Sequence, residues 1–112
     1  MTYKLIATDE MNRLLEECTK YLINTLKSRQ AAQHLLDGVE KIYSDLEYDP
    51  EIYRISQDPF MEALQYREAK VPEMNYVIIY RISGEVVYLL GIFHILENYE
   101  RKIRILWNNH WE

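Results

Sequence analysis

Residues 65–94 most constrain the fold of this chain, because three short stretches of strand-forming residues alternate there with turn residues. These stretches predict strands at Tyr66–Val71, Asn75–Ile82 and Glu85–Phe93. Ser83-Gly84 reads as a two-residue hairpin loop, since glycine readily takes the positive φ that such a turn needs. The last stretch is apolar on both faces, which is typical of a central strand covered by helices on one side. Its polar end places His94 at the rim of the sheet.

Two segments of helical periodicity precede these strands. Apolar residues recur at intervals of three and four within residues 11–26 and again within residues 31–46. Ser28 is a good N-cap for the second helix, and the very short link predicts an antiparallel helical hairpin. Gly38 weakens the second helix, which predicts a close approach of helix and sheet at that point. The residues ahead of the hairpin, Tyr3–Ala7, form a predicted first strand.

The remaining segments complete an α+β domain that spans residues 1–112. Glu51–Leu64 is the longest irregular segment, with one predicted helical turn at Phe60–Leu64, and loops of this length often contact partners. Apolar residues return at helical spacing after the last strand, which predicts a C-terminal helical extension over about 95–112. The predicted fold is therefore an N-terminal strand and helical hairpin packed on a small antiparallel β-sheet, plus a C-terminal helix.

Charge and composition exclude several classes of function. A net charge of −5 does not suit general, salt-driven binding to nucleic acid. Cys18 has no disulfide partner, and its place on the apolar stripe of the first helix predicts a small core residue. His34, His94 and His110 lie far apart, without the spacing of a metal site, so neither a metal nor another cofactor is predicted. No run reaches membrane-spanning length, and the first residues are too polar for a signal peptide, so we predict a cytoplasmic protein without membrane contact.

A strand, a helical hairpin and an antiparallel meander that ends in Ile92-Phe93-His94 resemble the RelE/ParE toxin superfamily. The resemblance covers roughly residues 3–99. Its best segments are Arg29-Gln-Ala-Ala32, Tyr66-Arg67, the run 75–84, and His94. It implies the toxin of a bacterial type II toxin–antitoxin pair, of the plasmid-stabilisation type, neutralised by a cognate antitoxin that lies across its surface. Some members cleave messenger RNA on the ribosome, and others bind DNA gyrase.

The RNA-cleaving branch of that superfamily implies a set of catalytic residues. Its members need no metal, because basic side chains hold the phosphate while a tyrosine or histidine assists proton transfer to and from the 2′-hydroxyl. The resemblance carries these roles to Arg67, His94 and Tyr99. Each residue also has a structural interpretation. Arg67 would pair with a nearby acid, His94 would cap a strand end, and Tyr99 would pack within the C-terminal helix.

The chain departs from the cleaving branch at several positions that usually carry positive charge. Val77 replaces an arginine of the next strand, and Leu96-Glu97 replaces two further cations after the histidine. Arg81 comes later in its strand, beside the hairpin loop. A phosphate site that loses cations in this way is weak. We therefore favour a toxin that binds DNA gyrase, with a ribosome-dependent mRNA endoribonuclease and a non-toxic partner-binding member as alternatives.

Basic side chains and a tryptophan are the candidate contacts with the target or the antitoxin. They are Lys70, Arg81, Arg101, Lys102, Arg104 and Trp107. The cations of residues 101–104 are either a solvated helix face or a docking surface for an acidic antitoxin, because opposite charges steer association. Trp107 is either a binding hot spot or a core residue that folds back onto the domain.

Overall fold

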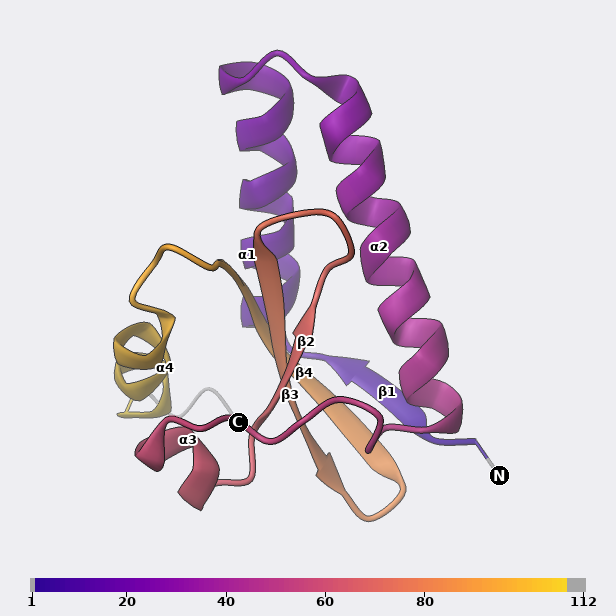
Figure 1. The fold of residues 1–112 in the computed structure, drawn as a ribbon, viewed down its shortest axis with the longest axis vertical. Coiled ribbons are helices and arrows are strands. Elements are labelled where there is room, and N and C mark those ends of the chain that lie inside the picture. The colour runs from indigo at the N-terminus through magenta and orange to yellow at the C-terminus, as the bar shows by residue number, and fades with distance from the viewer. Residues whose placement is uncertain (1, 109–112) are drawn as a thin grey trace.

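A four-stranded sheet forms the centre of the computed structural model, which describes residues 2–108 and, within α4, side chains up to residue 105. The strands are β1 (Lys4–Ala7), β2 (Arg67–Lys70), β3 (Tyr76–Ser83) and β4 (Val86–His94), in the spatial order β1-β4-β3-β2 (Figure 1). The meander β2-β3-β4 is antiparallel, as predicted, and β4 has a neighbour on each side. Strand β1 pairs in parallel with β4, so the sheet is mixed. The α+β class is confirmed.

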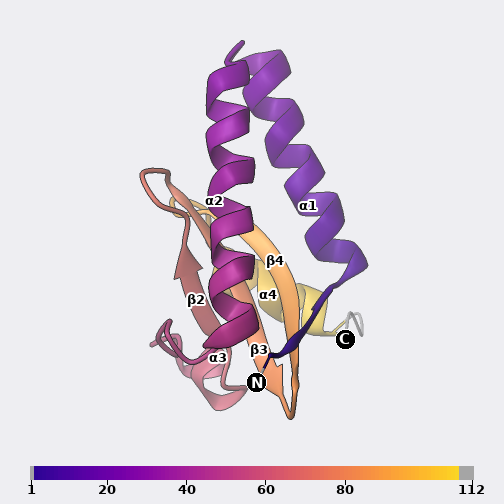
Figure 2. The same ribbon diagram turned by 90° about the vertical axis from the view of Figure 1, so that its right-hand side faces the viewer.

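The predicted helical hairpin is present, and a side-chain cap begins each of its two helices. Helix α1 (Asp9–Lys20) begins after Thr8, whose Oγ1 accepts a hydrogen bond from the main-chain N–H of Met11 at 3.1 Å. It runs into a π-helical turn, η1 (Tyr21–Thr25). Helix α2 (Arg29–Tyr48) begins after Ser28, which caps it in the same way. The two helices are antiparallel, and their connected ends rise beyond the end of the sheet (Figures 1 and 2).

Helices cover both faces of the sheet, where the sequence predicted cover on one. Successive residues of a strand face opposite sides, so β3 contributes Ile78 and Tyr80 to a core under the hairpin. Its Val77 and Ile79 enter a second core under α3 (Pro59–Ala63) and α4 (Tyr99–Asn108). Helix α3 is the predicted helical turn, begun by Asp58. Helix α4 starts four residues later than residue 95, because residues 94–97 form a turn first.

Gly84 and Gly38 take the roles that the sequence predicts, but the hairpin loop is Gly84-Glu85 and not Ser83-Gly84, because Ser83 still pairs with Val86. Gly84 has a φ of 61° in the β3–β4 hairpin loop, which is the left-handed conformation that glycine favours. At Gly38, an added Cβ would lie 2.5 Å from Cγ1 of Val71, so the helix approaches the sheet margin too closely for any side chain. The absence of a side chain at Gly38 therefore sets the distance between α2 and the residues that follow β2.

Gly38→Ala is expected to lower stability although alanine is the better helix former. Alanine favours a helix by about 1 kcal/mol, whereas overpacking against a buried β-branched residue costs about 1–3 kcal/mol. We expect a net loss near 1 kcal/mol in the free energy of unfolding, measured by urea denaturation. In a Val71→Ala background the clash is gone, so the same Gly38→Ala change should become neutral or stabilising. A stabilising effect in the unaltered background would contradict the close approach.

Candidate functional site

Arg67, the first residue of β2, is tied to the irregular segment that precedes α3. Its Nη1 donates hydrogen bonds to the main-chain oxygens of Tyr53 at 2.7 Å and Glu51 at 3.4 Å. The carboxylate of Glu51 lies 3.9 Å from Nη2. Only 17% of the Arg67 side chain is exposed. The guanidinium therefore fastens the 51–53 segment to the sheet, and a phosphate would have to displace main-chain carbonyls to reach it.

Tyr99 begins α4 and lies on the other face of the sheet. Its ring stacks on Phe93, with centroids 6.0 Å apart and planes 21° from parallel. Its hydroxyl donates a hydrogen bond to Oε2 of Glu68 at 3.0 Å. Burial, followed by the negative charge of Glu68, raises the pKa of Tyr99 to about 12. The hydroxyl therefore keeps its proton at neutral pH, and the residue serves packing.

His94 ends β4 and organises the turn that follows. Its Nδ1 accepts a hydrogen bond from the main-chain N–H of Leu96 at 3.1 Å, which leaves the proton of the neutral imidazole on Nε2. Its own main-chain N–H donates to Oε1 of Glu97 at 2.8 Å. The imidazole packs edge-on against Tyr76, its partner in the β3–β4 register, with centroids 5.3 Å apart. His94 is thus at the sheet rim, as predicted, and caps the strand end.

The three candidate catalytic residues do not converge in this structure. Arg67 lies opposite Tyr80 on β3, whereas His94 lies opposite Tyr76. Four residues along a strand correspond to roughly 13 Å. Tyr99 is bound to Glu68 on the opposite face of the sheet. One phosphate group therefore has no position from which it contacts all three.

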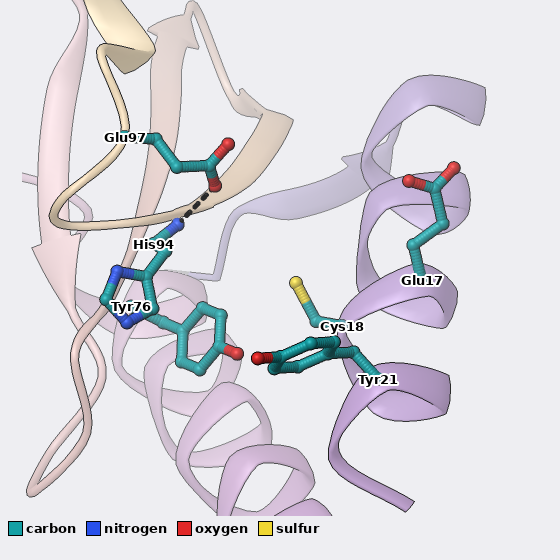
Figure 3. A pocket seen from close by; sticks show the side chains of 6 residues that line it. All are labelled: Glu17, Cys18, Tyr21, Tyr76, His94 and Glu97. Atoms are coloured by element: carbon teal, nitrogen blue, oxygen red, sulfur yellow. Dashed lines mark hydrogen bonds between the residues drawn. The ribbon is translucent and has the colours of Figure 1, made fainter. Parts of the chain in front are cut away.

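A pocket of about 310 Å³ surrounds His94 between the hairpin and the turn after β4. It is lined by Glu17, Cys18, Tyr21, Tyr76, His94 and Glu97 (Figure 3). The sequence predicted His94 but not its neighbours. Glu17 and Tyr21 are four residues apart and share a helix face, which is a signal that the sequence does contain. The approach of Tyr76 depends on the strand register.

Cys18 and Glu97 in this pocket keep their ordinary charge states at neutral pH. Burial raises the pKa of the Cys18 thiol to about 11, and the charges of Glu97 and Glu17 act in the same direction. The thiol is therefore not a nucleophile. Burial opposes ionisation of Glu97, but hydrogen bonds from Lys102 and from the main-chain N–H of His94 prevail and lower its pKa. The pocket thus contains a neutral thiol and an ionised carboxylate.

The predicted contact cations are spread over the molecule. Lys102 forms an ion pair with Glu97, whereas Arg104 lies over the ring of Phe60, 4.7 Å from its centroid. Arg101 is exposed on α4 and Lys70 on β2, and Arg81 lies 4.7 Å from the ring centroid of Tyr88. The side chain of Trp107 falls outside the described part of the structure. Lys102 and Arg104 point to different sides of α4, so residues 101–104 do not form one basic surface.

Residues 2–108 contain no group of three or more histidine, cysteine, aspartate or glutamate side chains that is placed to hold a metal ion. Within the same range, every helix is too short or too polar to span a lipid bilayer.

Comparison with known proteins gives the family of this fold. The model of a family described as the ParE toxin of the type II toxin–antitoxin system, parDE, matches residues 5–99. The chain belongs to the ParE toxin family. A solved structure entitled "Chromosomal ParDE TA system from P. aeruginosa" is similar to this ParE-family toxin with a TM-score of 0.68. Their sequences are 15% identical, and the match covers 83% of this chain and 96% of that one, which shows the shared fold. No curated protein sequence matches the chain.

Proposed function

We propose that this ParE-family toxin arrests bacterial growth by binding DNA gyrase, and that a cognate antitoxin neutralises it. The observation that carries the first part is the dispersal of Arg67, His94 and Tyr99 over two faces and two levels of the sheet. A toxin that acts by binding needs no convergent acid, base and phosphate clamp. A toxin that cleaves RNA does.

The charge of the chain supports the same choice. Arg67 is engaged by main-chain oxygens, and Lys102 by Glu97, so neither is poised for a phosphate. The net charge of −5 adds a general repulsion toward RNA. A folded protein target carries no such uniform negative charge. Binding to a protein such as gyrase is therefore the more favourable mode of action.

The matching family and the similar solved structure support an antitoxin partner. The similar solved structure is entitled as a ParDE TA system, and the matching family is described as the toxin of a type II toxin–antitoxin system. We expect a small protein encoded beside this chain to bind it and to restore growth when the two are expressed together. Continued growth arrest in the presence of an excess of that protein would contradict the pairing.

Growth arrest should be accompanied by a change in DNA topology while transcripts remain intact. We expect induction in a bacterial culture to stop growth, with altered plasmid supercoiling on topoisomer gels and unbroken messenger RNA in the same samples. Tyr99→Phe keeps the stacked ring and loses only the bond to Glu68, so it should still arrest growth. Early transcript cleavage that Tyr99→Phe abolishes would instead identify an endoribonuclease.

A further inference from the structure

The pocket around His94 joins aromatic rings and carboxylates on separate elements. Tyr76 is 7% exposed and fixed within the core, while Tyr21 is 49% exposed on η1. Figure 3 shows the hydroxyl ends of these two tyrosines pointing toward one another across the pocket, with Cys18 beside them. Glu17 lies on the helical side and Glu97 on the side of the turn after β4. The pocket therefore has one rigid ring, one accessible ring and an acid on each side.

Acidic neighbours act on Tyr76 and Cys18 in this pocket, whereas Lys102 and His94 lower the pKa of Glu97. Burial raises the pKa of Tyr76, and the neighbouring acidic groups Cys18, Tyr21 and Glu97 raise it further. Both glutamates have the same effect on Cys18. The cations that pair with those glutamates, Arg13 and Lys102, line the adjoining groove between α1 and α4, which shares Glu17 with the pocket. No arginine or lysine is among the described residues that line the pocket.

These features suit a cationic side chain. The face of a tyrosine ring attracts a cation, and carboxylates at the same site strengthen this attraction. A guanidinium matches the arrangement better than an ammonium, because it is flat, stacks on rings and bonds carboxylates through two parallel donors. Glu97 already accepts bonds from the His94 main chain and from Lys102, but a carboxylate has about four acceptor sites. A phosphate or nucleic acid would be repelled.

We propose that the pocket receives an arginine side chain of the antitoxin. This rests on the proposed toxin–antitoxin function. Apolar surface beside the pocket fits the residues that would flank such an arginine. Leu96, whose main chain bonds to His94, is 87% exposed. The adjoining groove between α1 and α4 is lined partly by Leu14, Phe93 and Ile105. An arginine within an otherwise apolar segment would fill the pocket and cover both surfaces.

Two small probes test the pocket on the purified toxin. We expect N-acetyl-arginine amide to shift the NMR signals of the Tyr21, Tyr76 and His94 rings in a saturable way. N-acetyl-citrulline amide has the same shape without the charge, and it should shift them weakly or not at all. Added salt should raise the Kd of the arginine probe. Equal binding of the two probes, or arginine shifts centred elsewhere on the protein, would overturn the proposal.

Variants of the lining residues sharpen the test. Glu17→Gln, Glu97→Gln and Tyr21→Leu should each weaken the arginine probe by about two- to tenfold. The amide introduced by Glu97→Gln retains an oxygen that can accept the His94 main-chain hydrogen bond, so the turn is expected to persist. Glu16→Gln is the matched control, since it removes the same charge from an exposed residue of α1 that pairs with Lys20 and does not line the pocket. An equal loss of probe affinity in Glu16→Gln would show that the effect is general electrostatics, and it would contradict the proposal.

The toxin–antitoxin complex separates this inference from the proposed function. If an antitoxin arginine fills the pocket, the probe should no longer shift the Tyr76 and His94 signals in the complex. Probe binding that persists there would exclude the antitoxin as the occupant. Selective binding by a toxin that fails to arrest growth would leave the pocket intact and remove the proposed function. Growth arrest by a toxin that does not bind the arginine probe selectively would leave the proposed function intact and exclude the arginine pocket.

Discussion

Ile103→Asp should release α4 from the sheet while the helical hairpin remains folded. Ile103 is fully buried in the core that contains Val77, Ile79 and Phe93. Truncating such a residue to alanine costs about 2–5 kcal/mol, and a buried unpaired carboxylate costs more. Since the sheet separates this core from the one under the hairpin, the damage should stay on one side. We expect amide hydrogen exchange to show lost protection in α4 and retained protection in α2.

Ile105→Asp provides the control for this result. It makes the same change two residues further along α4, at a side chain that is 52% exposed. The effect on α4 protection should be small there, because the added charge stays in water. Unchanged protection of α4 in Ile103→Asp would show that the helix is held by other contacts. Loss of protection in α2 as well would show that the two cores unfold as one unit.

Arg67→Ala should destabilise the domain through the segment before α3. The substitution removes the guanidinium that donates hydrogen bonds to two main-chain oxygens. The oxygen of Tyr53 then loses its 2.7 Å hydrogen bond. Losing a hydrogen bond from a charged, largely buried donor costs about 1.5–3 kcal/mol. For a domain of this size, we expect the melting temperature to fall by roughly 5–15 °C. Differential scanning calorimetry measures this fall directly.

Arg54→Ala is the matched control for Arg67→Ala. Arg54 is also paired with an acid, Glu68 at 3.6 Å, but its side chain is 67% exposed. Exposed ion pairs contribute about 0–1 kcal/mol, so the melting temperature should hardly change. An Arg67→Ala protein that melts normally, arrests growth no longer and spares messenger RNA would contradict the structural role. That result would indicate that Arg67 contacts the target of the toxin.

Signals that act over a few residues predicted their parts of the fold correctly. Ser28 caps α2 and Gly84 lies in the hairpin loop, one residue from the predicted register, because capping and turn geometry depend on neighbouring residues alone. The parallel pairing of β1 with β4 was not predicted, since nothing local records which strand a distant segment joins. A signal for the second layer of helices is present in β3. Val77 and Ile79 are as apolar as Ile78, which indicates that both faces of this strand are covered.

The candidate site was predicted less well than the fold, for a related reason. His94 could be placed at the sheet rim because it directly follows an apolar strand. Its neighbours Tyr21 and Tyr76 come from two other elements, and their meeting requires the tilt of the hairpin and the β3–β4 register. Resemblance to the RNA-cleaving branch grouped Arg67 with His94. Such a resemblance matches residue types, and it does not give the distance between their side chains. The strand register places them apart.

The parallel pairing of β1 with β4 also sets an order of events during synthesis. Lys4 finds its partner Val86 only 82 residues later in the chain. At a synthesis rate of about 5–20 residues per second, roughly 4–16 seconds pass between the two. Contacts between such distant residues also form slowly because a long loop must close first. The nascent toxin therefore completes its sheet only after β4 has been made, and an antitoxin already present can meet it as it first takes shape.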